Sequence, residues 1–154
     1  MARLTRYVFR STWHVNARYD DVCAVLADVT TYPLWWPEVK SVEPVGDGRY
    51  RMVARSLLPY ELRFVSEEQN GGRTAGVIEA RLAGDLEGFA RFRVEDLGAS
   101  CRMVYDQEVE THRAVLNALA PIARLPFRFN HWLMMRHGEA GLRTFMAGYG
   151  RARR

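Results

Sequence analysis

Hydrophobic and polar residues alternate along most of the first two thirds of the chain. From Leu4 to Val15 a mainly aromatic and apolar series, which is typical of a strand with one buried face, alternates with a more polar one. The first series is Tyr7, Phe9, Ser11, Trp13 and Val15, and the second is Val8, Arg10, Thr12 and His14. Similar segments follow, and turn residues such as Gly46-Asp47-Gly48 and Asn70-Gly71-Gly72 separate them at hairpin length. The further strands are predicted over 42–45, 49–57, 60–67, 74–82, 86–94 and 102–111. The pattern therefore predicts an antiparallel meander of about six or seven strands, with one apolar face and one face exposed to solvent.

Two short helices interrupt this pattern after the first strand. Between Ala17 and Val29 the apolar residues recur at helical spacing, and Asp20 and Asp21 lie in the first turn, where negative charge is favourable. The segment from Asp28 to Val39 then places two tryptophans between two prolines. Because proline disfavours a helical residue before it, this segment predicts a second short helical turn that ends in a sharp bend.

The C-terminal segment predicts one long amphipathic helix from Pro126 to Tyr149, about 35 Å in length. One face is apolar and carries Phe127, His131, Met134, Gly138, Leu142 and Phe145. Small residues beside flexible methionines leave room, so we expect a cavity between this helix and the sheet. The alternative is that His131 is structural and bonds a backbone carbonyl, while the glycines let a strand approach closely.

Length and composition indicate a single domain over residues 1–154, since 48% hydrophobic residues can form a sizeable core. We find no transmembrane segment and no signal peptide, and expect a cytoplasmic protein. Cys23 and Cys101 have no spacing for zinc or redox chemistry, and the histidines are not spaced as metal ligands. No metal and no cofactor are therefore expected.

The net charge of +4 comes almost entirely from arginines, because Lys40 is the only lysine. These arginines are mixed with acidic residues along the strands, and no reading helix or basic-aromatic patch accompanies them, so no nucleic acid is expected as a partner. The cluster of Arg151, Arg153 and Arg154 is interpreted as a solvated helix end. The expected partner is a hydrophobic small molecule, and the protein is expected to be a monomer or a homodimer.

The order of a strand, two short helices, a meander and a long helix is α+β, with a curved sheet that grips one helix. On the segments from Phe9 to Val15, Val22 to Ala27 and Asp28 to Val39, on Gly84 to Gly88, and on the late Asn130-His131 with Met134, Met135 and Gly138, the chain resembles the START-like helix-grip (SRPBCC) superfamily. This group includes polyketide cyclase/dehydrase-like proteins. The resemblance covers almost the whole chain and implies the helix-grip fold and a ligand pocket, but no common catalytic set.

The parity of the strands predicts the wall of that pocket. The inward positions and the helix face give these candidate ligand-binding residues: Trp35, Trp36, Met52, Leu62, Phe64, Ile78, Phe92, Gln107, Asn130, Met134 and Gly138. We place Trp35 and Trp36 near the entrance, with core packing as the alternative. The outward carboxylates, Glu79 and Asp106 among them, are expected on the wet face.

Two functions remain open. As a carrier or sensor, the domain buries an aromatic, lipid-like or polyketide-like ligand, and the polar groups only fix its orientation. As a polyketide cyclase/dehydratase (aromatase-type), which the resemblance allows, His131 serves as acid/base while Tyr60 or Tyr105 polarises a carbonyl. Hydrophobic ligand binding is the favoured hypothesis, and His131 is the residue that separates the two.

Overall fold

The computed structural model describes residues 6–55, 61–69, 75–111 and 114–152, with the backbone alone over 114–127. The chain runs β1 (Arg6–Val15), α1 (Tyr19–Ala27), η1 (Val29–Thr31), α2 (Tyr32–Trp35), β2 (Val39–Gly46), β3 (Arg49–Ala54), β4 (Leu62–Glu68), β5 (Val77–Gly84), β6 (Leu86–Asp96), β7 (Cys101–Thr111) and α3 (Ala114–Ala152). This order confirms the α+β prediction and the helix-grip fold. The predicted residues of the strand from Leu4 that precede Arg6 lie outside the described residues.

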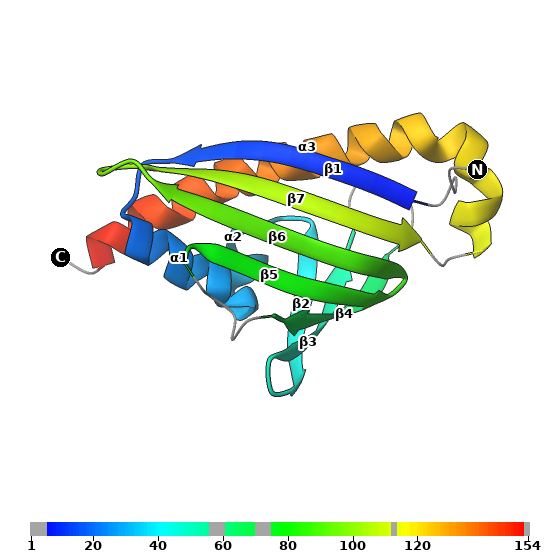
Figure 1. The fold of residues 1–154 in the computed structure, drawn as a ribbon, viewed down its shortest axis with the longest axis horizontal. Helices are drawn as coiled ribbons and strands as arrows, with labels where there is room; N and C mark the ends of the chain where they lie inside the picture. Colours follow the sequence, from blue (N-terminus) through cyan, green and yellow to red (C-terminus); the bar gives the residue numbers. More distant parts are fainter. Residues whose placement is uncertain (1–5, 56–60, 70–74, 112–113, 153–154) are drawn as a thin grey trace.

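The seven strands form one antiparallel sheet in the order β1-β7-β6-β5-β4-β3-β2. Sequential strands are neighbours because hairpin-length connections join them, and β1 closes the far edge by pairing with β7. Figure 1 shows the sheet curving around the long helix, with α1 and α2 near the C-terminal end of α3. The sheet and α3 therefore enclose the interior between them.

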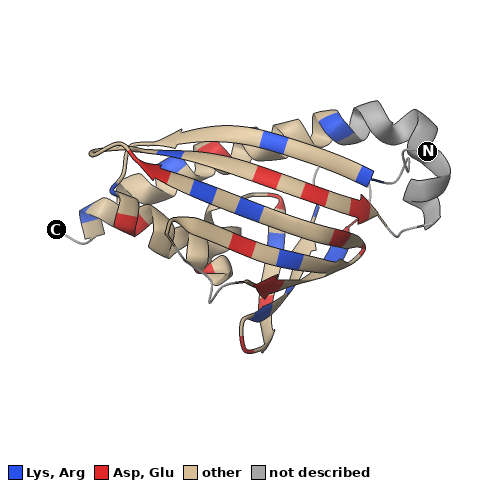
Figure 2. Ribbon diagram, viewed as in Figure 1, with Lys and Arg blue, Asp and Glu red and all other residues tan. Residues whose placement is uncertain are grey.

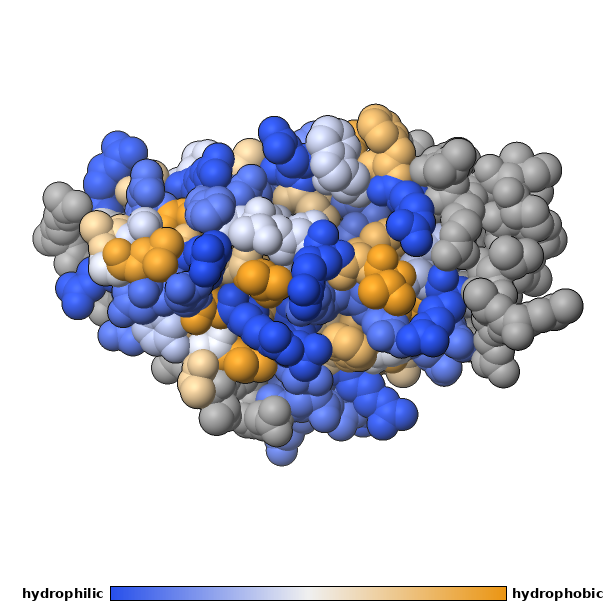
Figure 3. Space-filling model, turned by 45° about the horizontal axis from the view of Figure 1, so that its top comes forward, coloured by the Kyte–Doolittle hydropathy of each residue, from blue (hydrophilic) through white to orange (hydrophobic). Residues whose placement is uncertain are grey.

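The outer face of the sheet carries the charges that alternation predicted. Acidic and basic residues lie across neighbouring strands in Figure 2, and Figure 3 shows a mainly hydrophilic surface with hydrophobic residues scattered over it. Arg10 pairs with Asp106 across β1 and β7 at 2.7 Å, and Arg91 pairs with Glu79 across β6 and β5 at 3.7 Å. These are exposed or half-exposed pairs, which typically contribute little to stability. They mark the water-facing side and leave the other face for the core.

The long helix begins earlier than the sequence predicted. It starts at Ala114 rather than Pro126, so that Pro121 and Pro126 lie inside it. The sequence predicts a helix that begins at Pro126, and proline is favoured at the first position of a helix. Prolines within a helix remove backbone hydrogen bonds and bend it, and Figure 1 shows α3 curving near its N-terminal end.

Tryptophans dominate the core where α3 crosses the short helices. Trp13 of β1 lies 5.4 Å from Trp36 between ring centroids, and Trp35 stacks on Trp36 at 5.5 Å. All three are buried, together with Leu142 of α3. A Cβ atom at Gly138 would lie 2.8 Å from the rings of both Trp13 and Trp36, and one at Gly141 would lie 1.7 Å from the Trp35 carbonyl oxygen.

The prediction that Gly138 lines a cavity is therefore wrong. Gly138 and Gly141 are small because the tryptophan cluster and the α2 backbone approach α3 at these two positions. The alternative interpretation, in which the glycines allow another element to approach the helix closely, is the correct one. The approaching elements are α2 and β1 rather than a strand alone. The cavity itself begins one turn nearer the N-terminus, at Met134 and Met135.

Candidate functional site

A cavity of about 150 Å³ lies between the sheet and α3. Its wall combines inward-facing residues of all seven strands with residues from η1, from α2 and its end, and from α3, and it is mainly apolar. The described residues that line it are Phe9, Val29, Tyr32, Trp36, Val39, Met52, Ala54, Arg55, Leu62, Phe64, Ser66, Ile78, Ala80, Leu82, Leu86, Ala90, Phe92, Tyr105, Gln107, Val109, Asn130, His131, Met134 and Met135.

Most of the candidate residues from the sequence lie on this wall, because alternation fixes which side chains of a strand share a face. Those on the wall are Trp36, Met52, Leu62, Phe64, Ile78, Phe92, Tyr105, Gln107, Asn130, His131 and Met134. Trp35 and Gly138 do not reach it. Tyr60 lies outside the described residues. The candidates did not include three further wall residues, Phe9, Tyr32 and Leu86. Alternation along the first strand places Phe9 on its buried face, but nothing in the sequence identifies it as a residue of the cavity wall.

Three polar side chains form a chain on the wall. The Tyr105 hydroxyl donates to Gln107 Oε1 at 2.9 Å, and His131 Nε2 lies 2.8 Å from the same oxygen. Since a carbonyl oxygen only accepts, His131 carries its proton on Nε2 and donates it to Gln107. The other ring nitrogen, Nδ1, is then an acceptor. Neither it nor the amide nitrogen of Gln107 has a hydrogen-bond partner among the described residues.

Burial keeps this chain uncharged at neutral pH. Loss of hydration lowers the pKa of His131 from 6.5 to about 4, so the imidazole is neutral at pH 7. The Phe9 ring stacks on it at 3.6 Å between centroids and 8° between planes, which covers one face of the imidazole. Burial likewise raises the pKa of the Tyr105 hydroxyl, which therefore stays protonated. The site offers one unused acceptor on His131 and an unused donor on Gln107.

The bend that carries Trp35 and Trp36 is not the entrance of the cavity. Trp35 and Trp36 are both buried, and only Trp36 reaches the cavity. The Trp36 Nε1–H donates to the carbonyl oxygen of Met134 at 2.9 Å, which fastens the end of α2 to α3. Arg55, just after β3, is the exposed residue on the described part of the wall and marks the rim. The prediction that Trp35 and Trp36 lie near the entrance is therefore wrong, and the alternative, core packing, holds.

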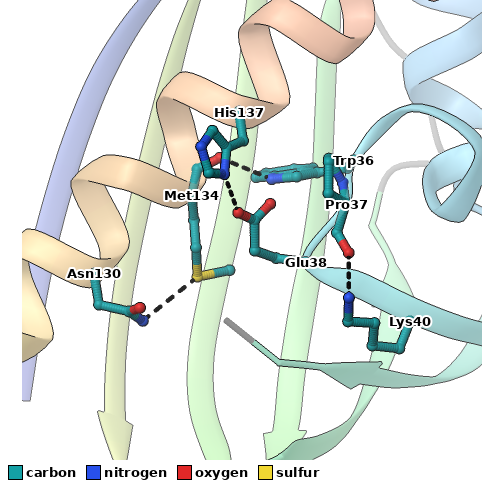
Figure 4. Close-up of polar contacts among 7 residues, drawn as sticks. All are labelled: Trp36, Pro37, Glu38, Lys40, Asn130, Met134 and His137. Carbon is teal, nitrogen blue, oxygen red and sulfur yellow. Dashed lines mark hydrogen bonds and ion pairs between the residues drawn. The ribbon is translucent and has the colours of Figure 1, made fainter. Parts of the chain in front are cut away.

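A second polar contact joins the same bend to α3. His137 Nδ1 lies 2.5 Å from Glu38 Oε1, as Figure 4 shows beside the Trp36–Met134 bond. Glu38 is buried, and its second oxygen, Oε2, has no hydrogen-bond partner among the described residues. Neither residue lines the cavity. No local pattern indicates this pair, because 99 positions separate its members in the chain.

The described residues contain no group of three or more side chains that could hold a metal ion. Cys23 and Cys101 are both buried, and they form no disulfide within the described part of the chain. None of the described helices has the length and apolar character needed to cross a membrane.

The fold agrees with what comparisons with known proteins show. Residues 6–134 match the family model described as polyketide cyclase / dehydrase and lipid transport, so the chain belongs to that family. No curated protein matches the sequence.

Several solved structures are similar to this chain. The Zhui aromatase/cyclase from Streptomyces sp. R1128 has 19% identity and a TM-score of 0.73, over 92% of this chain and 94% of its own. A START superfamily protein from Mycobacterium smegmatis has 17% identity and a TM-score of 0.71, over 92% and 98%. A conserved protein from Geobacillus kaustophilus has 11% identity and a TM-score of 0.75, over 92% and 96%. At these identities the likeness shows the fold alone.

Proposed function

We propose that this protein binds a small hydrophobic molecule, aromatic or lipid-like, in the cavity between the sheet and α3. The observation that carries the proposal is an apolar cavity whose wall holds one uncharged polar chain, Tyr105–Gln107–His131, with a donor and an acceptor unused. Such a wall favours apolar ligands, and its few polar groups set their orientation. The family description, which includes lipid transport, supports a hydrophobic ligand.

The free groups indicate the polar part of the ligand. A hydroxyl can donate to His131 Nδ1 and accept from the amide of Gln107, whereas a carbonyl can use the amide alone. A charged ligand group is disfavoured, because the wall offers it a neutral imidazole and a buried, protonated phenol. We therefore expect a neutral molecule with one oxygen at this end.

The volume indicates the size of the apolar part. An apolar cavity of about 150 Å³ accommodates a molecule of roughly benzene size. Met52, Met134 and Met135 line the cavity, and methionine side chains repack easily. A ligand of two or more fused rings, or an acyl chain, would be admitted by movement of these side chains.

A cavity-filling pair of variants tests the proposal. Ala80 faces the cavity on β5, while Ala83 on the same strand is exposed on the outer face. Binding of 1-naphthol, an aromatic ring system with one hydroxyl, is measured by calorimetry. Ala80→Phe should weaken binding at least about tenfold, and Ala83→Phe should leave it unchanged. Wild-type affinity in a folded Ala80→Phe variant would contradict the proposal.

Cyclase or dehydratase activity is the second candidate, favoured by one observation: a neutral imidazole with an unprotonated Nδ1 beside the cavity. His131 could then take a proton from a carbon next to a carbonyl. The Tyr105 hydroxyl is directed at Gln107, so the amide of Gln107 replaces it as the group that polarises the carbonyl oxygen. With a genuine substrate, His131→Gln should lower turnover about a hundredfold with little change in affinity. Turnover that survives this change removes the acid/base role.

A further inference from the structure

Two large aromatic side chains of α3 point to water. Phe129 is 57% exposed and Trp132 is 53% exposed, and their rings stack at 5.8 Å between centroids. The other three tryptophans, by contrast, are buried in the core. An exposed aromatic pair costs hydration free energy in an isolated molecule, and such a patch is typical of a surface that meets a partner.

Two arginines flank this pair. Arg136 lies over the Trp132 ring at 5.6 Å from its centroid, and Arg128 lies one helical turn before Trp132 on the same side of the helix. Both are exposed, and neither forms an ion pair with a described residue. By contrast, most arginines on the sheet face carboxylates across the strands, Arg10 and Asp106 for example. The aromatic pair with these two arginines, hereafter the aromatic-arginine surface, lacks an anionic counterpart within the described part of the molecule.

We infer that the aromatic-arginine surface docks on an anionic phospholipid bilayer. Tryptophan and phenylalanine are favourable at the depth of the lipid headgroups, and arginines beside them attract anionic lipids. A second copy of the chain fits less well. In a two-fold contact Arg128 and Arg136 of both copies would face each other, so that like charges meet. A bilayer offers negative charge and an apolar layer together.

The surface lies close to the cavity in the fold. Asn130, His131 and Met134 line the cavity from the same two turns of α3 that present Phe129 and Trp132 on the outside. Docking at this surface would place the inner wall of the proposed ligand site one helix diameter from the membrane. The inference concerns the outer surface and stands whether or not the cavity binds a ligand.

Vesicle binding tests the inference directly. The protein is sedimented with vesicles of phosphatidylcholine alone and with vesicles that also contain phosphatidylglycerol. We expect binding to the anionic vesicles only, weakened by added salt, with a blue shift in emission from Trp132, the tryptophan exposed to water. Arg128→Gln with Arg136→Gln should weaken binding about thirtyfold. Phe129→Ser with Trp132→Ser should weaken it at least about tenfold.

Two matched variants serve as controls. Arg81→Gln removes an exposed arginine from β5, and Leu97→Ser removes an exposed apolar side chain from the turn between β6 and β7. Both should bind as the wild type does, and circular dichroism should show all variants folded. Three results would overturn the inference: no sedimentation with anionic vesicles, equal loss in the controls, or a dimer in solution that Trp132→Ser dissociates.

Discussion

Replacing Gly141 with alanine should destabilise the protein sharply, because this residue sets the distance between α3 and α2. An added Cβ would lie 1.7 Å from the carbonyl oxygen of Trp35, far closer than any real contact, and a backbone oxygen cannot rotate away. The helix would have to move outward by more than an ångström. Overpacking of this kind costs about 3 kcal/mol or more, while alanine in place of glycine returns about 1 kcal/mol of helix propensity. The net loss is about 2 kcal/mol or more.

Gly148 offers a matched control in the same helix. Apart from its chain neighbours and the backbone of its own helix, no atom of a described residue lies within 4 Å of the position its Cβ would take. Gly148→Ala should therefore stabilise the protein by about 0.5–1 kcal/mol through helix propensity alone. Urea denaturation followed by far-ultraviolet circular dichroism gives both free energies of unfolding. A Gly141→Ala variant as stable as the wild type would refute the close approach of α2 to α3.

Three further predictions concern the polar groups. The pKa of His131 is about 4 in the folded protein and 6.5 in its ordinary state, so the unfolded chain binds a proton first as the pH falls. The free energy of unfolding should therefore be about 2 kcal/mol lower at about pH 5 than above pH 6.5. In urea denaturation, His131→Gln should lose this part of the pH dependence. His137→Ala should lower the free energy of unfolding by about 1–3 kcal/mol, because it leaves the buried Glu38 carboxylate without its partner. Adding Glu38→Leu should recover part of this loss. A double variant that is less stable than His137→Ala alone would contradict the pairing of Glu38 with His137. Gln107→Leu should weaken 1-naphthol binding about tenfold, since it removes the donor and also frees His131 Nε2; unchanged affinity by calorimetry would remove Gln107 from the ligand site.

The sheet was predictable from the sequence because its signals are local. Alternation fixes which residues of a strand share a face, and the hairpin turns fix the order of the strands. This is why Met52, Ile78 and Phe92, on three different strands, were assigned to one wall, where the structure places them. The start of α3 was missed because a proline suits the first turn of a helix as well as a bent interior.

The roles of the helix glycines and tryptophans could not be settled from the sequence. Spacing shows that Gly138 lies on the inner face of α3, but the same small residue suits an empty space and a close contact equally well. Which applies depends on the partners, here Trp13 and Trp36, which are both more than 100 residues away in the sequence. The Glu38–His137 pair is a long-range contact of the same kind. Tertiary packing decides such cases, and local pattern does not encode it.

Native mass spectrometry of the purified protein, followed by organic extraction, tests the central claim most directly. We predict that a neutral hydrophobic molecule with at least one oxygen accompanies the wild-type chain or rebinds after extraction, and that Ala80→Phe does not retain it while Ala83→Phe does. A molecule retained equally by the folded Ala80→Phe variant would place the binding site outside the cavity and contradict the account.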